Sequence, residues 1–153
     1  SSASKAQLLT SEMGLDAGLD HRAPDFVERL KVEAGDGVDL FFDNVGGPLR
    51  AALLDRMNTF GRIVVCGMIA EYNDDETSGP GWLPILTRQL TVRGFLVNAF
   101  DHLRDDFLRD ASAWIEQGRL VIREDITDGL ENTPGTFIRM LQGQTFGKAI
   151  IRL

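Results

Sequence analysis

The sequence is poor in cysteine and histidine, and this scarcity excludes several kinds of site. The one cysteine, Cys66, can neither form an internal disulfide bond nor belong to a cysteine-rich metal site. The two histidines, His21 and His102, lack metal-ligand spacing with Cys66. The hydrolase motifs G-x-S-x-G and H-E-x-x-H are also absent. We therefore predict no metal site, and we expect a cytoplasmic protein because a single cysteine suits a reducing compartment.

The sequence also lacks long hydrophobic runs and an excess of positive charge. No run approaches the ~18 apolar residues of a membrane-spanning helix. Acidic residues outnumber basic residues by 23 to 16, which gives a net charge of −7. This balance provides no electrostatic footprint for nucleic acid or for an anionic membrane surface. We expect neither partner, and an anionic ligand would need a local site.

What the 153 residues do contain is typical of one globular domain, with 43% hydrophobic and 25% charged residues. Hydrophobic spacing and glycine or proline stops predict helices that alternate with β-favouring runs. The predicted helices are residues 3–13, a helix opening at Pro24 and ending before Gly35, and residues 48–57, 83–89, 101–117 and 134–141. The predicted strands are residues 38–42, 62–67, 90–97, 120–122 and 148–153, with turns at 58–61 and 125–132 and a polar loop at 71–81. This alternation predicts an α/β fold with a doubly wound, Rossmann-like parallel sheet.

Short segments lie at the carboxyl ends of three predicted strands, and the first two of these segments contain glycine. The three segments are residues 43–47, 66–69 and 95–97. In open parallel sheets, ligands bind beyond the carboxyl ends of the strands, and glycine lets a ligand approach the backbone closely. The same glycines can simply turn the chain, so spacing alone leaves both interpretations open.

Five short segments occur in a characteristic order: FDNVGG (42–47), RIVVCG (62–67), GFLV (94–97), RED with GLEN (123–125 and 129–132), and FGK (146–148). Together they resemble the carboxyl-terminal half of zinc-independent medium-chain dehydrogenases/reductases of the prostaglandin reductase (leukotriene hydroxydehydrogenase) and NADP-dependent alkenal/enone reductase family. The resemblance implies a Rossmann domain that binds NADP(H). It also implies an oxidoreductase that transfers hydride to the β-carbon of an α,β-unsaturated aldehyde or ketone.

The resemblance also implies roles for residues before and after the first predicted strand. Lys5 would face the 2′-phosphate of the cofactor, although a solvated surface lysine is the alternative. His21 stands where the family often has a tyrosine near the adenine ribose or phosphate, and a plain surface histidine is equally consistent. Asn44 would contact the cofactor from the FDNVGG turn.

The remaining implied site residues follow the second and third strands, apart from one near the carboxyl end. Those expected to line the nicotinamide and its ribose are Cys66, Gly67, Met68, Ile69 and Tyr72. Tyr72, the only tyrosine, is also the catalytic candidate, with an aromatic lid over the core as its alternative. Backbone groups of Phe95, Leu96 and Val97 would meet the carboxamide. Thr145 stands where the family commonly has asparagine.

The sequence contains no glycine-rich phosphate loop of the G-x-G-x-x-G kind before Lys5. Together with the start at Ser1, this predicts the carboxyl-terminal part of a longer reductase, inactive alone, with a gap in its sheet. We expect residues 1–118 to form a partial cofactor domain and residues 119–153 to return toward a catalytic domain. The strand at 90–97 is expected to form a homodimer by edge pairing. The alternatives are a non-catalytic dimerisation or interaction module and a quinone reductase of the same superfamily.

Overall fold

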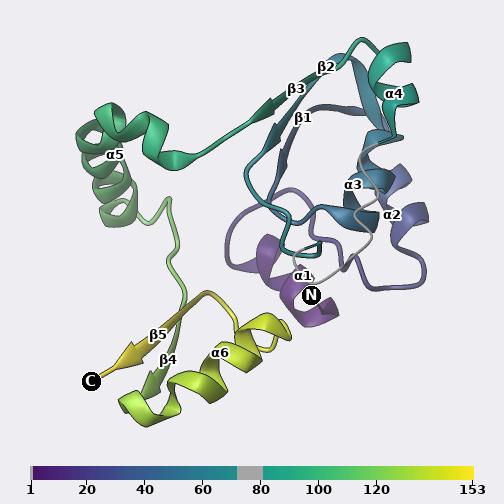
Figure 1. Cartoon of the computed structure of the whole chain (residues 1–153). Helices are drawn as coiled ribbons and strands as arrows, with labels where there is room; N and C mark the ends of the chain where they lie inside the picture. Colours follow the sequence, from purple (N-terminus) through teal and green to yellow (C-terminus); the bar gives the residue numbers. More distant parts are fainter. Residues whose placement is uncertain (1, 72–80) are drawn as a thin grey trace. The chain divides into compact units, whose positions relative to one another are not determined.

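The computed structural model describes residues 2–71 and 81–153, and it divides into two compact units (Figure 1). One unit comprises residues 24–104. The other comprises the chain up to Ala23 together with residues 105–153. Each unit contains its own parallel sheet. The expected α/β class with parallel strands is therefore confirmed.

The unit of residues 24–104 is built around a three-stranded parallel sheet in the order β1-β2-β3. The strands are β1 (Val38–Asp43), β2 (Met57–Val65) and β3 (Thr91–Gly94), and the helices of this unit are α2 (Phe26–Glu33), α3 (Gly47–Leu54), α4 (Trp82–Thr87) and the 3₁₀ helix η1 (Val97–Leu103). Asp43 lies opposite Val65, which in turn lies opposite Gly94. The three carboxyl ends of the strands are thus level with one another.

The hydrophobic core of this unit lies on one face of the sheet. Phe41 of β1 and Ile63 of β2 are buried there with Leu54 and Met57. The partly buried side chains packed against them come from strands and helices alike: Val38, Leu53, Val65, Ile85 and Leu90. Successive strand residues point to opposite faces, and the next side chains along β1, Leu40 and Phe42, are 63% and 51% exposed.

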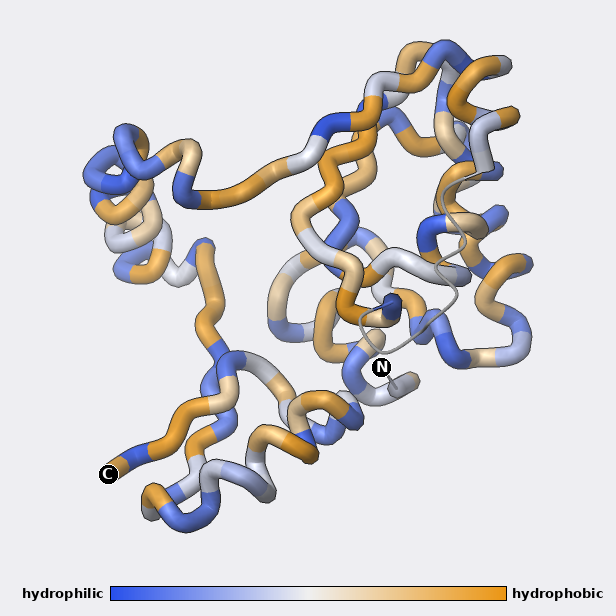
Figure 2. The backbone as a smooth tube through the Cα atoms, in the orientation of Figure 1, coloured by the Kyte–Doolittle hydropathy of each residue, from blue (hydrophilic) through white to orange (hydrophobic). Residues whose placement is uncertain are grey.

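The second unit pairs β4 (Glu124–Asp128) with β5 (Lys148–Arg152) as a two-stranded parallel sheet. Ile126 lies opposite Ile150, and Figure 2 shows the hydrophobic run along β5. Its helices are α1 (Ala3–Ser11), α5 (Arg104–Glu116), which begins at the boundary between the units, the short 3₁₀ helix η2 (Leu130–Asn132), and α6 (Thr133–Leu141). The Ser2 hydroxyl caps α1 by accepting a hydrogen bond from the Lys5 N–H.

Several sequence-based boundaries were wrong. The predicted strand 90–97 is a strand only over Thr91–Gly94, and residues 97–103 form η1. The predicted strand at 120–122 is irregular chain, and β4 instead occupies part of the predicted acidic turn at 125–132. Partners distant in sequence bind the carboxylates of this acidic strand: Asp125 pairs with Arg139, and Asp128 pairs with Arg152. Hydrophobic patterning does not detect such partners.

The other two corrections concern the start of β2. The predicted helix 48–57 ends at Leu54, and the predicted turn at 58–61 lies inside β2, which begins at Met57. Phe60 has a positive φ of 65°, and the register with β1 shifts between Val38 and Leu40. The turn residues therefore form an irregularity within the strand.

Candidate functional site

The carboxyl ends of β1, β2 and β3 meet at one edge of the sheet, and backbone hydrogen bonds join the loops that follow them. The N–H groups of Cys66 and Gly67 both donate to the Asp43 carbonyl oxygen, at 2.8 and 3.1 Å. The Phe95 N–H donates to the Val65 carbonyl oxygen at 2.9 Å. These bonds continue the strand pairing past the last strand residue, so the loops leave the sheet in a fixed arrangement.

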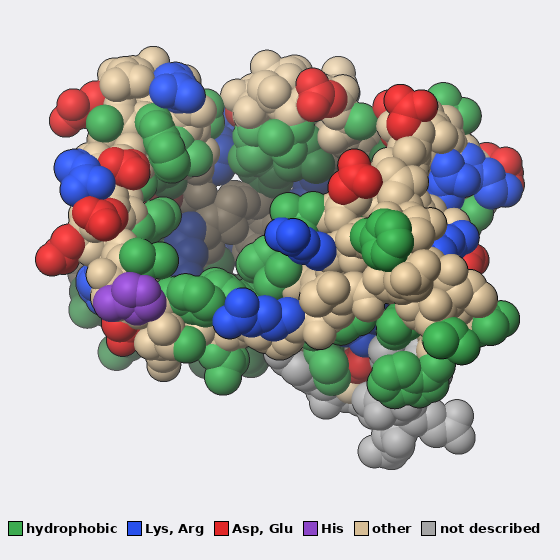
Figure 3. Space-filling model, turned by 90° about the horizontal axis from the view of Figure 1, so that it is seen from above, with side chains coloured by type: hydrophobic (Ala, Val, Ile, Leu, Met, Phe, Trp, Pro, Cys, Tyr) green, Lys and Arg blue, Asp and Glu red, His purple; other side chains and the backbone are tan. Residues whose placement is uncertain are grey.

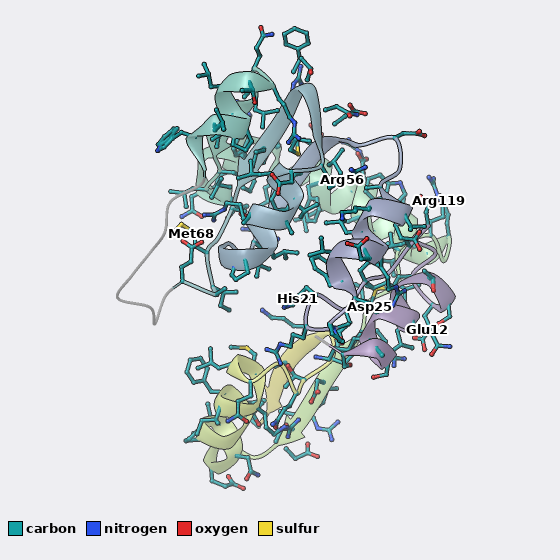
Figure 4. All side chains as sticks on the ribbon, turned by 90° about the vertical axis from the view of Figure 1, so that its right-hand side faces the viewer. Glu12, His21, Asp25, Arg56, Met68 and Arg119 are labelled. Atoms are coloured by element: carbon teal, nitrogen blue, oxygen red, sulfur yellow. The ribbon has the colours of Figure 1, made fainter. Side chains whose placement is uncertain are left out.

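An open pocket of about 560 Å³ lies at this edge, between the ends of β2 and β3. Its wall is mostly apolar and includes short stretches of accessible backbone. The lining residues are Val65, Cys66, Gly67, Met68, Gly94, Phe95, Leu96 and Ala99. Figure 4 shows Met68 on the loop that follows β2. An apolar hollow with a few backbone polar groups suits a flat ring that carries an amide.

Five of the residues predicted for the nicotinamide end line this pocket: Cys66, Gly67, Met68, Phe95 and Leu96. Two further predicted residues, Ile69 and Val97, are absent from its lining and are 52% and 66% exposed. Tyr72 lies outside the described residues. Sequence reasoning missed Val65, Gly94 and Ala99, of which Gly94 could have been found as the glycine that ends a β-favouring run.

A row of aromatic rings fixes the outer wall of the pocket. The Phe95 ring stacks on Phe100 with 5.0 Å between centroids, and its other neighbour, Phe42, meets it edge-on at 5.8 Å. The His102 ring stacks on Phe100 with 6.4 Å between centroids. Such ring contacts favour one orientation of Phe95, which keeps the backbone of residues 95–96 at the pocket.

Asn44 lies beside Gly67 at the end of β1. A Cβ atom added to Gly67 would come within 3.1 Å of the Asn44 carbonyl oxygen, so the absence of a side chain at Gly67 allows the two loops to approach. The Asn44 residue itself is exposed. The structure thus brings Asn44 next to a residue of the pocket wall, as the strand-end argument predicted.

A buried ionic network, which the sequence did not reveal, supports the Asn44 turn. Asp43 is 1% exposed, and its carboxylate accepts hydrogen bonds from the N–H groups of Val45 and Gly46 at 2.9 and 2.8 Å. Its other oxygen lies 2.6 Å from Arg50 Nε. Arg50 Nη1 lies 3.0 Å from Glu71 Oε1. The FDNVGG motif pointed to the turn, but nothing in the sequence linked Arg50 to a residue 21 positions later.

Lys5 and Thr145 lie together in the other unit. The Lys5 ammonium donates to the carbonyl oxygens of Gly143 and Thr145, both at 2.5 Å. Thr145 is buried. An ammonium has three donors, so these two bonds leave one for another acceptor. The two residues predicted at opposite ends of the chain are thus brought into contact.

His21 is exposed in the unit that contains Lys5 (Figure 4). Partial desolvation lowers the pKa of the His21 imidazole below its ordinary value of 6.5, and the charge of Arg22 lowers this pKa further. Asp20 opposes the shift. The ring is therefore mainly neutral at pH 7, and it can both donate and accept a hydrogen bond.

Residues 2–71 and 81–153 contain neither a group of metal ligands nor a membrane-spanning helix. No three His, Cys, Asp or Glu side chains in these ranges are grouped so that they could hold a metal ion. Within the same ranges, none of the helices has the length and apolar character needed to cross a membrane.

Comparison with curated proteins finds reductases of similar sequence. The chain is 39% identical to the NADPH-dependent curcumin reductase of Escherichia coli K12, over 99% of the chain and 46% of that protein. It is 37% identical to prostaglandin reductase 1 of Bos taurus, over 91% of the chain and 44% of that protein. It is 36% identical to the NADP(+)-dependent 2-alkenal reductase of Nicotiana tabacum, over 96% of the chain and 43% of that protein. The chain spans about half the length of the curated relatives it matches.

The chain is also similar in structure to a solved protein. The crystal structure of CurA from Vibrio vulnificus in complex with NADPH matches with a TM-score of 0.91 and 34% identity, over 99% of the chain and 47% of CurA. The family description "Zinc-binding dehydrogenase" matches residues 13–151. The described residues offer no donor set for the zinc in that description. With most of its length matched, the chain belongs to the zinc-binding dehydrogenase family.

Proposed function

We propose that this chain forms the nicotinamide-binding part of an NADP(H)-dependent oxidoreductase. The enzyme reduces the carbon–carbon double bond of α,β-unsaturated aldehydes and ketones. The observation that carries the proposal is the apolar pocket at the strand ends, because five residues that the resemblance assigns to the nicotinamide line it. Support comes from relatives named as NADPH-dependent curcumin reductase and NADP(+)-dependent 2-alkenal reductase.

The bound cofactor supplies the hydride, and the protein positions the ring that carries it. In this proposal, the apolar walls formed by Val65, Met68 and Ala99 hold the ring and exclude water. Backbone groups of residues 66–68 and 95–96 meet the carboxamide, which has both a donor and an acceptor. The exposed Asn44 amide adds a polar contact beside Gly67.

Other predicted contacts remain part of the proposal. Lys5 uses its third ammonium donor for the 2′-phosphate, with His21 near the adenine ribose and Thr145 fixing Lys5 through its carbonyl oxygen. Ile69, Tyr72 and Val97 contact the nicotinamide ribose or the substrate. The division into residues 1–118 and 119–153 also stays a prediction, as do the cytoplasmic location and the independence of zinc. The 153 residues alone are expected not to turn over substrate.

Titration of the protein with NADPH and with NADH tests the proposal through the fluorescence of Trp82 and Trp114. We expect saturable binding of NADPH at a concentration at least tenfold below that required for NADH. Consumption of NADPH with an alkenal, followed at 340 nm in the protein from the complete reading frame, tests the reaction. Absence of binding up to millimolar NADPH would reject the cofactor site. Turnover of quinones but not of enones would favour the quinone reductase alternative.

A homodimer formed through residues 90–97 is a second proposal, which also covers a non-catalytic interaction role. Among the described strands, β3 pairs only with β2, and all four of its residues are exposed. In neighbouring α4, Trp82, Leu83 and Leu86 are 76%, 69% and 75% exposed. Figure 3 shows hydrophobic side chains exposed in several places on the face of the molecule that it draws. An unpaired strand edge can pair with a second copy of itself.

Light scattering with size-exclusion chromatography measures the dimer directly. Val92→Pro removes an N–H donor from β3 and should convert a dimer to a monomer. Arg119→Ala, outside this strand, is the matched surface control. A monomeric unsubstituted protein would reject the dimer and leave the cofactor proposal standing.

A further inference from the structure

Arg50 and Glu71, which belong neither to the pocket lining nor to the segments that carry the resemblance, form the centre of a buried network. Their side chains are both 8% exposed, and that of Asp43 is fully buried. Arg50 bridges Asp43 on one side and Glu71 on the other, at 2.6 and 3.0 Å. Glu71 also accepts a hydrogen bond from the Gly47 N–H at 2.5 Å.

This network joins the two loops that carry the proposed cofactor contacts. Asp43 and Gly47 flank the turn after β1 that contains Asn44. Glu71 belongs to the segment that follows β2, and its own N–H donates to the carbonyl oxygen of Met68 in the pocket wall. The Ala70 N–H adds a backbone link to Val45 at 3.0 Å. Arg50 and the Glu71 carboxylate are therefore the side-chain links between the Asn44 turn and the pocket loop.

Stability alone is a weak reason for such an arrangement. Burying an ion pair costs desolvation that often equals its Coulombic gain. Here two carboxylates share one guanidinium, and Arg50 Nη2 is buried with no hydrogen-bond partner among the described residues. Gly46 packs tightly against this network, because a Cβ atom added at Gly46 would lie 2.4 Å from Glu71 Oε1 and 2.9 Å from Arg50 Nη2.

We infer that Arg50 and Glu71 are positioning residues that lock the Asn44 turn against the pocket loop in the arrangement that binds the nicotinamide end. This inference rests on the proposed function. The lock has a further consequence for specificity. Carboxylates already occupy the N–H groups of Val45, Gly46 and Gly47 at the start of α3. The turn therefore meets an uncharged part of the ligand through Asn44, and phosphate binds elsewhere.

Glu71→Ala tests the lock in the protein expressed from the complete reading frame. The substitution leaves the Gly47 N–H and one side of Arg50 unpaired, so we expect the Kd for NADPH to rise about tenfold. Glu71→Gln retains an oxygen that can accept from Gly47, and it should restore most of the affinity. Arg88→Ala is the matched control, because Arg88 bonds the carbonyl oxygens of Leu54 and Asp55 at the opposite end of α3. It should lower the urea midpoint comparably while leaving the Kd unchanged.

Hydrogen exchange provides a readout that does not depend on the cofactor. Amides of residues 45–47 and 70–71 should exchange at least tenfold faster in Glu71→Ala and at the normal rate in Arg88→Ala. Unchanged exchange at these amides, or an unchanged NADPH Kd with only a lower urea midpoint, would overturn the inference. If the unsubstituted protein binds no NADPH, the proposed function fails, and the exchange rates still decide whether Arg50 and Glu71 lock the two loops.

Discussion

The two units solve the problem of holding a loop in different ways. In the unit of residues 24–104, backbone hydrogen bonds and buried charges fix the loops that follow the strands, and Asp43 is 1% exposed. In the other unit, the ion pair between Arg152 of β5 and Asp128 of β4 lies at the surface, with side chains 64% and 70% exposed. The buried ion pairs therefore tolerate little change, whereas water can replace the partners of an exposed pair.

The largest effect is expected at Gly67. Gly67→Val adds a branched side chain whose Cβ would lie 3.1 Å from the Asn44 carbonyl oxygen. The added methyl groups would also occupy space in the pocket that Gly67 lines. We expect the Kd for NADPH to rise more than a hundredfold by fluorescence titration. Gly135→Ala is the control, because a Cβ there meets nothing within 4 Å. Normal NADPH binding by the Gly67→Val protein would mean that the cofactor does not bind in this pocket.

Replacing one buried and one exposed carboxylate measures the difference between the units. Asp43→Ala leaves Arg50 Nε and the N–H groups of Val45 and Gly46 without a partner, so we expect a loss of about 3–5 kcal/mol in the free energy of unfolding. Asp128→Ala breaks an exposed pair and should cost about 0.2–1 kcal/mol. Urea unfolding of both variants provides the comparison. Equal losses would contradict the contrast between buried and surface pairs.

The sequence predicted the pocket better than it predicted the ionic contacts. Cys66, Gly67 and Phe95 lie at the carboxyl ends of β-favouring runs, and parallel strands bring such positions to one edge of the sheet. The bridge from Arg50 to Glu71 depends on where two separate loops come together. The same limitation hid the partners of Asp125 and Asp128, and for this reason β4 was read as a turn.

A substitution at Lys5 can distinguish a structural role of this side chain from a role in the preference for NADPH over NADH. Lys5→Gln removes the positive charge but retains an amide that can donate to Gly143 or Thr145. If Lys5 also binds the 2′-phosphate, the Kd for NADPH should rise about tenfold, while weak binding of NADH should not change. Parallel fluorescence titrations with both cofactors measure this ratio. Equal changes for the two cofactors would assign Lys5 only to the loop that it contacts through carbonyl oxygens.

The smallest effect is expected at His21, whose pKa is lowered mainly by desolvation. A lowered pKa means that the folded state disfavours the protonated imidazole, so the contribution of His21 to stability is present above pH 6.5 and declines as the pH falls below it. Proton NMR titration should place this pKa below 6.5. His21→Asn should flatten this part of the profile of urea midpoint against pH. If His21 lies near a cofactor phosphate, NADPH should raise the pKa, because a nearby anion favours the imidazolium ion. The same pKa with and without NADPH would place His21 away from the phosphates, while leaving the pocket at the strand ends unaffected.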